Sequence, residues 1–158
     1  MKTIVIKIIS GGQTGADQGG LDAAIFLNIP HGGWCPKGRK SENGTIPAKY
    51  NLKEFNSPYY IHRTRQNVID SDATIVFAYG APKGGSLKTV DFAKTYNRPC
   101  LVIDMNNSEE QIIATVKNWL QNLQNEVILN IAGSRGSTSP DLHYKVKQIL
   151  IECLKEFS

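Results

Sequence analysis

Apolar positions along the chain alternate between two spacings. Nearly continuous apolar segments, as expected for strands buried on both faces, occur at Thr3–Ile9, Ala73–Tyr79, Pro99–Asp104 and Val127–Ala132. Between them, apolar residues recur at helical spacing in Asp17–Leu27, Arg63–Asp70, Ser86–Tyr96, Ser108–Leu123 and a last helix that Pro140 begins. The alternation predicts an α/β fold over residues 1–158: a single Rossmann-like domain with a mostly parallel sheet covered by helices on both faces.

Two segments fall outside this alternation. Pro30–Asn51 is rich in glycine, proline and charged residues, and we expect it to be a long loop that lies over a ligand. Tyr59–His62 is predicted to be extended, ahead of the helix that begins at Arg63.

Composition narrows the class of protein. The 158 residues suit one domain, and 41% hydrophobic with 20% charged residues excludes a disordered or fibrous chain. The apolar start is too short to span a bilayer, and no signal-peptide cleavage pattern follows it. Cys35, Cys100 and Cys153 are odd in number and far apart, which implies neither a disulfide framework nor a zinc pair. We therefore expect a cytoplasmic protein without a membrane partner.

The net charge of +4 permits an anionic ligand. The basic residues are scattered among carboxylates rather than collected in a run. No nucleic-acid-binding signature is present, so we expect no specific nucleic-acid partner.

Three glycine-rich loops, Ser10–Asp17, Gly80–Ser86 and Gly133–Ser137, each follow a predicted strand and precede a predicted helix. Such loops gather at the carboxyl edge of a parallel sheet, where free N–H groups and helix N-termini favour an anion. One loop alone is equally well explained as turn chemistry, whereas three together favour a phosphate or nucleotide site. The candidate ligand-binding residues in them are Gly11, Gly12, Gln13, Thr14, Gly15, Asp17, Gly84, Gly85, Ser86, Gly133, Ser134, Arg135 and Ser137.

Other nucleotide sites and other chemistries are less well supported. The Gly-x-Gly-x-x-Gly fingerprint and the Gly-Lys-Ser/Thr end of a P-loop are both missing, which disfavours an NAD dehydrogenase or an ordinary P-loop NTPase. Asp17 and Asp72 are interpreted first as caps, with an acid or base role left open. Trp34 either stacks on a flat ring or closes the core edge, and Cys35 is either a soft-metal ligand or a small buried hydrophobe. We assign no metal site.

The chain resembles the SLOG superfamily, in particular its circularly permuted branch, whose members are often described as molybdenum carrier proteins. The resemblance covers nearly the whole chain. It rests on Ile9–Asp17, Gly32–Arg39, Arg63–Val68 with Ser71–Thr74, and Gly84–Ser86 with Thr89. It implies that Lys37, Arg39, Arg65, Asn67 and Thr89 also contact the ligand, and that the protein is a homodimer or a higher homo-oligomer.

The order of the parts indicates the permutation. Ala132–Ser137 looks like the segment that opens related phosphoribohydrolases, yet here it closes the chain. Those enzymes carry an arginine and a Pro-Gly-Gly-x-Gly-Thr-x-x-Glu motif, onto which Arg63 and the run from Gly84 to Asp91 fall by spacing. Lys83 stands for the proline, and Leu87 and Lys88 replace the Gly-Thr pair, which disfavours hydrolysis.

Two functions follow from the resemblance. The first is a carrier that binds molybdenum cofactor, a nucleotide or another phosphorylated ligand between the three loops. The alternative is an N-glycosidase of nucleoside monophosphates, with Asp91 stabilising the sugar cation and Arg63 the phosphate. The alternative expects Arg63 and Asp91 in one ligand-sized cleft.

Overall fold

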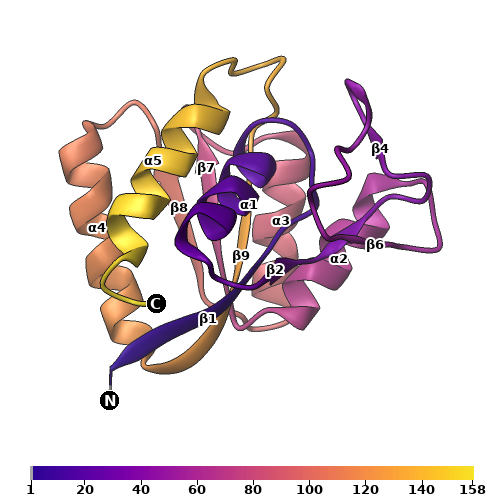
Figure 1. The fold of residues 1–158 in the computed structure, drawn as a ribbon. Coiled ribbons are helices and arrows are strands. Elements are labelled where there is room, and N and C mark those ends of the chain that lie inside the picture. Colours follow the sequence, from indigo (N-terminus) through magenta and orange to yellow (C-terminus); the bar gives the residue numbers. More distant parts are fainter. Residues whose placement is uncertain (1) are drawn as a thin grey trace.

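The computed structural model describes residues 2–158 and shows an α/β protein (Figure 1). Its main strands are β1 (Thr3–Ile9), β2 (His31–Gly32), β7 (Ala73–Ala78), β8 (Cys100–Asp104) and β9 (Asn125–Gly133). They form one sheet in the order β2-β1-β9-β7-β8, and every neighbouring pair is parallel. The parallel sheet predicted from the apolar segments is confirmed.

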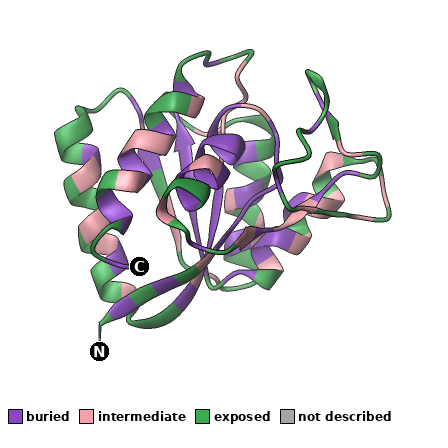
Figure 2. Ribbon diagram, viewed as in Figure 1, coloured by how far each residue is buried: buried purple, intermediate pink, exposed green. Residues whose placement is uncertain are grey.

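Helices cover both faces of this sheet, as predicted (Figure 1). One face carries α1 (Ala16–Leu27), α4 (Glu109–Leu123) and α5 (Leu142–Leu154), and the other carries α2 (Tyr60–Asp70) and α3 (Gly84–Thr95). Figure 2 shows the burial concentrated in the sheet and the inward helix faces, and every residue of β7 is buried. Among residues 2–158, no helix has both the length and the apolar character needed to cross a membrane.

The start of α2 differs from the sequence prediction. Tyr59–His62 was expected to be extended, which is wrong, because the helix begins at Tyr60. The Thr64 hydroxyl donates to the Tyr60 carbonyl at 2.8 Å, and Thr64 and Val68 are buried on the same helix. Packing of this face outweighs the strand preference of tyrosine and isoleucine.

The predicted loop Pro30–Asn51 is more ordered than expected. β3 (Trp34–Cys35) pairs in parallel with β6 (Lys53–Glu54), while β4 (Lys40–Ser41) and β5 (Gly44–Thr45) form an antiparallel hairpin. We call residues 33–57 the insert segment and residues 40–45 the hairpin. Both lie to one side of the sheet (Figure 1).

Arg39 holds the insert segment together. Its guanidinium donates to four backbone carbonyls within the segment, at Ile46 (3.3 Å), Pro47 (2.8 Å), Tyr50 (3.0 Å) and Leu52 (3.5 Å). Beneath it is a small second core, separate from the main one, made of Leu21, Cys35, Ile46, Tyr50 and the partly buried Leu52. Cys35 is thus a small buried hydrophobe, the second of the two interpretations given above.

A polar cluster links the insert segment to two helices. Asp22 on α1 accepts from the Tyr50 hydroxyl at 2.8 Å and lies 2.6 Å from Nε2 of His143 on α5. The contact between Asp22 and His143 joins residues 121 positions apart in the chain, and it gives His143, to which the sequence assigned no role, a structural one.

The three glycine-rich loops follow neighbouring strands. The first follows β1, the second follows β7 and the third follows β9, which lies between the other two. The first and third loops touch directly, because the Ala16 N–H donates to the Ser134 carbonyl at 3.1 Å. Gly15, at φ +85°, permits this contact, since a Cβ there would stand 2.2 Å from the Ser134 oxygen.

This contact predicts a difference between two glycines of nearly equal φ. Gly15→Ala combines the backbone strain of positive φ with a clash against backbone, and we expect it to lower the free energy of unfolding by about 3 kcal/mol or more. Gly38→Ala is the matched control, because Gly38 has φ +84° and nothing within 4 Å of an added Cβ. It should cost only about 1–2 kcal/mol. Urea unfolding measures both, and equal losses would contradict the close approach.

Candidate functional site

A cleft of about 730 Å³ opens at the carboxyl edge of the sheet. All three glycine-rich loops line it, together with the first turns of α2 and α3. The predicted residues that it brings together are Gln13, Asp17, Arg63, Gly84, Gly85, Ser86, Thr89, Gly133, Ser134 and Arg135. Segments from four parts of the chain therefore share one cavity, at the position where open parallel sheets usually bind ligands.

Other predicted residues lie outside the lining of this cleft. Arg39 binds carbonyls of the insert segment, and Asn67 donates to and accepts from the backbone of Trp34. Lys37 and Arg65 are exposed and do not line the cleft. Gly11, Gly12 and Gly15 shape the first loop, while Thr14 and Ser137 each stand next to a lining residue in the chain without lining the cleft themselves.

Asp91 is also outside the cleft, contrary to the expectation that it would share it with Arg63. On α3, Ser86 and Thr89 are buried toward the cleft, whereas Asp91 is exposed. It follows Thr89 by two residues, about 200° around the helix, so the two side chains point in opposite directions. Spacing in the sequence matched Asp91 to the hydrolase motif, but the helix turns it away.

A buried ion pair forms the floor of the cleft. Arg63 Nη1 lies 3.7 Å from Asp17 Oδ2, and their side chains are 11% and 7% exposed. The same Asp17 oxygen accepts from the Gln13 N–H at 3.2 Å. The guanidinium lies over Gly11, where a Cβ would stand 1.8 Å from Nη1. The glycine at position 11 is thus needed to seat Arg63.

Burial shifts the pKa of both charged groups in this pair. Desolvation raises the pKa of Asp17 to about 6, against the opposing effect of Arg63. Burial likewise lowers the pKa of the Arg63 guanidinium. Asp17 is the one carboxyl group among the residues that line the cleft, and it is therefore the group there suited to proton exchange near neutral pH.

Two buried polar atoms of the cleft residues have no partner in the structure, Gln13 Oε1 and Arg63 Nε. Gln13 is 3% exposed, and its amide nitrogen donates to the Lys40 carbonyl at 2.9 Å, which leaves the oxygen free. Buried polar groups are nearly always hydrogen-bonded, so an unpaired acceptor and an unpaired donor on two residues that line one cavity are exceptional.

The cleft is strongly positive. Arg63, Lys83, Lys88 and Arg135 line it, against Asp17 alone. The N-terminus of α3 adds to this potential, because no side chain caps it and its first turn holds no acidic residue. A ligand with several negative charges suits this lining.

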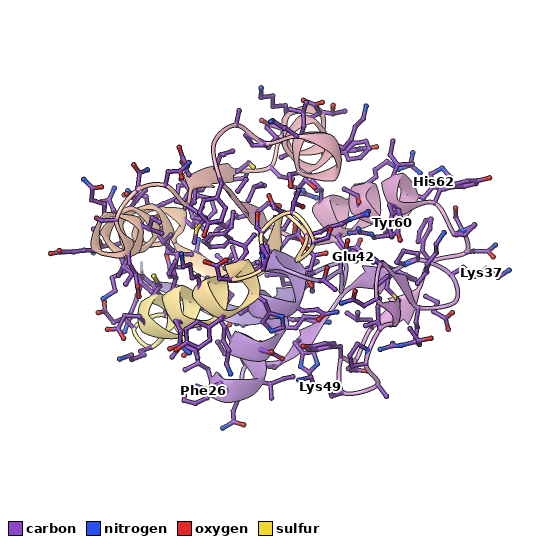
Figure 3. The ribbon with its side chains drawn as sticks, turned by 90° about the horizontal axis from the view of Figure 1, so that it is seen from above. Phe26, Lys37, Glu42, Lys49, Tyr60 and His62 are labelled. Atoms are coloured by element: carbon purple, nitrogen blue, oxygen red, sulfur yellow. The ribbon has the colours of Figure 1, made fainter. Side chains whose placement is uncertain are left out.

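Tyr60 is a central residue of the site that the sequence analysis missed. The Arg135 guanidinium lies 4.6 Å from its ring centroid, the Arg63 guanidinium 5.7 Å, and the Lys40 ammonium 5.8 Å. Tyr60, which is labelled in Figure 3, also lines the cleft. The sequence feature that could have indicated Tyr60 is its position three residues before Arg63, because residues three apart lie on one face of a helix.

The ion pair predicts how Asp17 titrates. Because its folded pKa of about 6 exceeds the ordinary 3.8, the folded state binds this proton more tightly than the unfolded state. The contribution of Asp17 to stability therefore falls as the pH rises from about 4 to 6. Arg63→Met removes the cation that favours the carboxylate, so the pKa of Asp17 should rise further. A carbon-13 NMR titration of the Asp17 carboxyl measures both values, and an unchanged midpoint in the variant would contradict the pairing.

Comparison with known proteins agrees with this architecture. The profile of the circularly permutated YpsA SLOG family matches residues 8–154. The crystal structure of a "putative molybdenum carrier protein" from Syntrophus aciditrophicus SB superposes with a TM-score of 0.91 and shares 42% sequence identity. The match covers 98% of this chain and 97% of that one. A search of curated proteins finds no match.

The family profile spans both the first glycine-rich loop and the last. The resemblance drawn from the sequence motifs is therefore confirmed at the level of family and fold. The chain belongs to the circularly permuted YpsA SLOG family.

Proposed function

We propose that this protein binds a phosphorylated small molecule, either a nucleotide or molybdenum cofactor, in the cleft between the three loops, and acts as its carrier. The observation that carries the proposal is the set of four cationic side chains in a cavity where Gln13 Oε1 and Arg63 Nε are buried without partners. The relative from Syntrophus aciditrophicus, which bears the name of a molybdenum carrier, supports the same class of ligand.

The phosphate end of such a ligand suits the second loop. An added Cβ at Gly84 or Gly85 meets no atom within 4 Å, so the backbone N–H groups at the start of α3 are open to close approach. Arg63 and Arg135 offer planar groups that pair with phosphate oxygens. A flat heterocycle would find the ring of Tyr60 and the free oxygen of Gln13, which accepts from a ring amine.

The metal of a molybdenum cofactor would be held through its organic part. Within residues 2–158, no group of three or more histidine, cysteine or acidic side chains is placed to bind a metal ion. The residues that suit the cofactor are therefore those that bind its phosphate and ring.

The hydrolase alternative receives no support from the position of its proposed carboxylate. Asp91 is exposed and lies outside the lining of the cleft, so it does not face a sugar held next to Arg63. We expect no release of free base from nucleoside monophosphates incubated with the protein, as followed by chromatography. If the wild type releases free base and Asp91→Asn abolishes that release, the hydrolase alternative is supported instead.

The binding function is tested by calorimetry with AMP. Gly85→Val fills the open space at the start of α3, so we expect AMP affinity to fall by about tenfold or more. Asp91→Asn is the matched control on the same helix and should change affinity by less than about twofold. Gly12→Val is a poorer test, because a Cβ there would stand 2.3 Å from Leu52 and disturb the second core.

Thermal unfolding of each variant confirms that it is folded, and mass spectrometry of the purified wild type identifies any ligand that is retained. If wild-type protein retains no ligand and binds neither AMP nor inorganic phosphate, the proposed function is wrong.

The family resemblance also leads us to propose a homodimer or higher homo-oligomer. Light scattering at several protein concentrations should give a mass at least twice the 17.4 kDa of the chain. A monomer mass at every concentration would refute this proposal.

A further inference from the structure

The carboxylate of Glu42 lies against two of the loops that line the cleft, in a place where a ligand oxyanion could bind. Glu42, at the tip of the hairpin, accepts from the Ser137 N–H at 3.1 Å and from the Ser137 hydroxyl at 2.6 Å. It also accepts from the Thr14 hydroxyl, which in turn accepts from the Gly136 N–H at 3.1 Å. One exposed side chain thus receives donors from both the first and the third glycine-rich loop.

These donors form an oxyanion site. Two hydroxyls and a backbone N–H converge on the Glu42 carboxylate, and the hydrogen bonds from Ser137 and Thr14 lower its pKa. The positive charge of Arg135 acts in the same direction. A carboxylate oxygen and a phosphate oxygen accept hydrogen bonds from the same kinds of donor. Thr14 and Ser137 are also the two loop hydroxyls, predicted to contact the ligand, that do not line the cleft.

The site adjoins the main cleft. Arg135, next but one to Ser137, lines the cleft and stacks on Tyr60, while Gln13, next to Thr14, lines its floor. A phosphorylated ligand in the cleft would therefore reach the donors that Glu42 now occupies.

We propose that Glu42 occupies an oxyanion subsite of the ligand cleft, formed by Thr14 and Ser137, and that a phosphate group of the ligand displaces it and releases the hairpin. The proposal rests on the proposed function, since it assumes that the cleft binds a phosphorylated ligand.

The hairpin is built so that its tip can move. Residues 42–45 are exposed, and Gly44, at φ +99°, has nothing within 4 Å of a Cβ position. The turn is closed internally, by the Ser41 hydroxyl donating to the Gly44 carbonyl at 2.9 Å. The fixed part begins on either side, at Arg39 and at Ile46 of the second core. Loss of the Glu42 contacts would free the tip without opening either core.

The first arm of the test measures binding of inorganic phosphate and AMP to Glu42→Gln. An internal carboxylate that competes for the subsite weakens apparent affinity, so the variant should bind phosphate about tenfold more tightly. Glu54→Gln is the matched control. Glu54 is an exposed carboxylate of the same insert segment that accepts from the Gly38 N–H at 2.6 Å, away from the cleft. Its affinity should match that of the wild type.

The second arm separates displacement from a simple change of charge, because loss of one negative charge near the cleft would by itself favour an anion. Saturating AMP should accelerate amide hydrogen exchange in residues 40–45 of the wild type. It should leave exchange unchanged in Glu42→Ala, which lacks the acceptor oxygens that tie the hairpin to Thr14 and Ser137. Exchange that AMP slows in the wild-type hairpin would overturn the proposal. So would unchanged or weaker phosphate binding by Glu42→Gln, which would mean that Glu42 supports the site.

The outcomes for the two proposals are distinct. Binding to the wild type without tighter binding to Glu42→Gln refutes displacement and leaves the carrier function standing. Absence of binding to both proteins refutes both proposals. Binding to Glu42→Gln but not to the wild type supports occupation of the subsite by Glu42 and, unless the purified wild type retains a ligand, refutes the carrier function.

Discussion

The position of the last strand sets the geometry of the whole carboxyl edge. β9 hydrogen-bonds to β1 on one side and to β7 on the other, so the last strand of the chain lies in the middle of the sheet. The loops that leave these three strands meet as neighbours, and the contact between Gly15 and Ser134 leaves no room for a side chain. A backbone packed this closely holds the cleft walls in place before any ligand arrives.

The electrostatic design of the cleft follows from that rigid frame. Arg63 and Asp17 are buried together, and the pair is only partly compensated, since Arg63 Nε has no partner and the ion pair is 3.7 Å long. A buried charge with incomplete hydrogen bonding costs stability. Such a cost is commonly found where a protein is organised for a ligand rather than for its own folding.

Much of the fold could be predicted from the sequence, because buried parallel strands and amphipathic helices leave clear periodic patterns. The glycine-rich loops were recognisable for a similar reason, since glycine marks positions where the backbone must approach closely. The start of α2 was missed because Tyr60 and Ile61 have strand preference, while the helix is held by the burial of Thr64 and Val68 further along it. Asp91 was misplaced because a motif spacing carries no information about which face of a helix a residue occupies.

Glu42 could not have been found from the sequence. It is an exposed acidic residue in a segment without periodicity, and its partner Ser137 is 95 positions further along the chain. Contacts of this kind depend on the register of the insert segment, which Arg39 sets through four carbonyls. A local sequence pattern carries no information about contacts between residues so far apart in the chain.

The first glycine-rich loop is also the boundary between two cores. A Cβ at Gly12 would meet Leu52 and Ile46 of the second core, while Ala16, four residues later, is buried in the main one. Local opening of the insert segment and of the sheet are thus coupled through a few residues of backbone. A molecule that binds this loop would stabilise both cores at once, apart from the hairpin tip that it releases, so binding at the cleft would slow local opening at a distance from it.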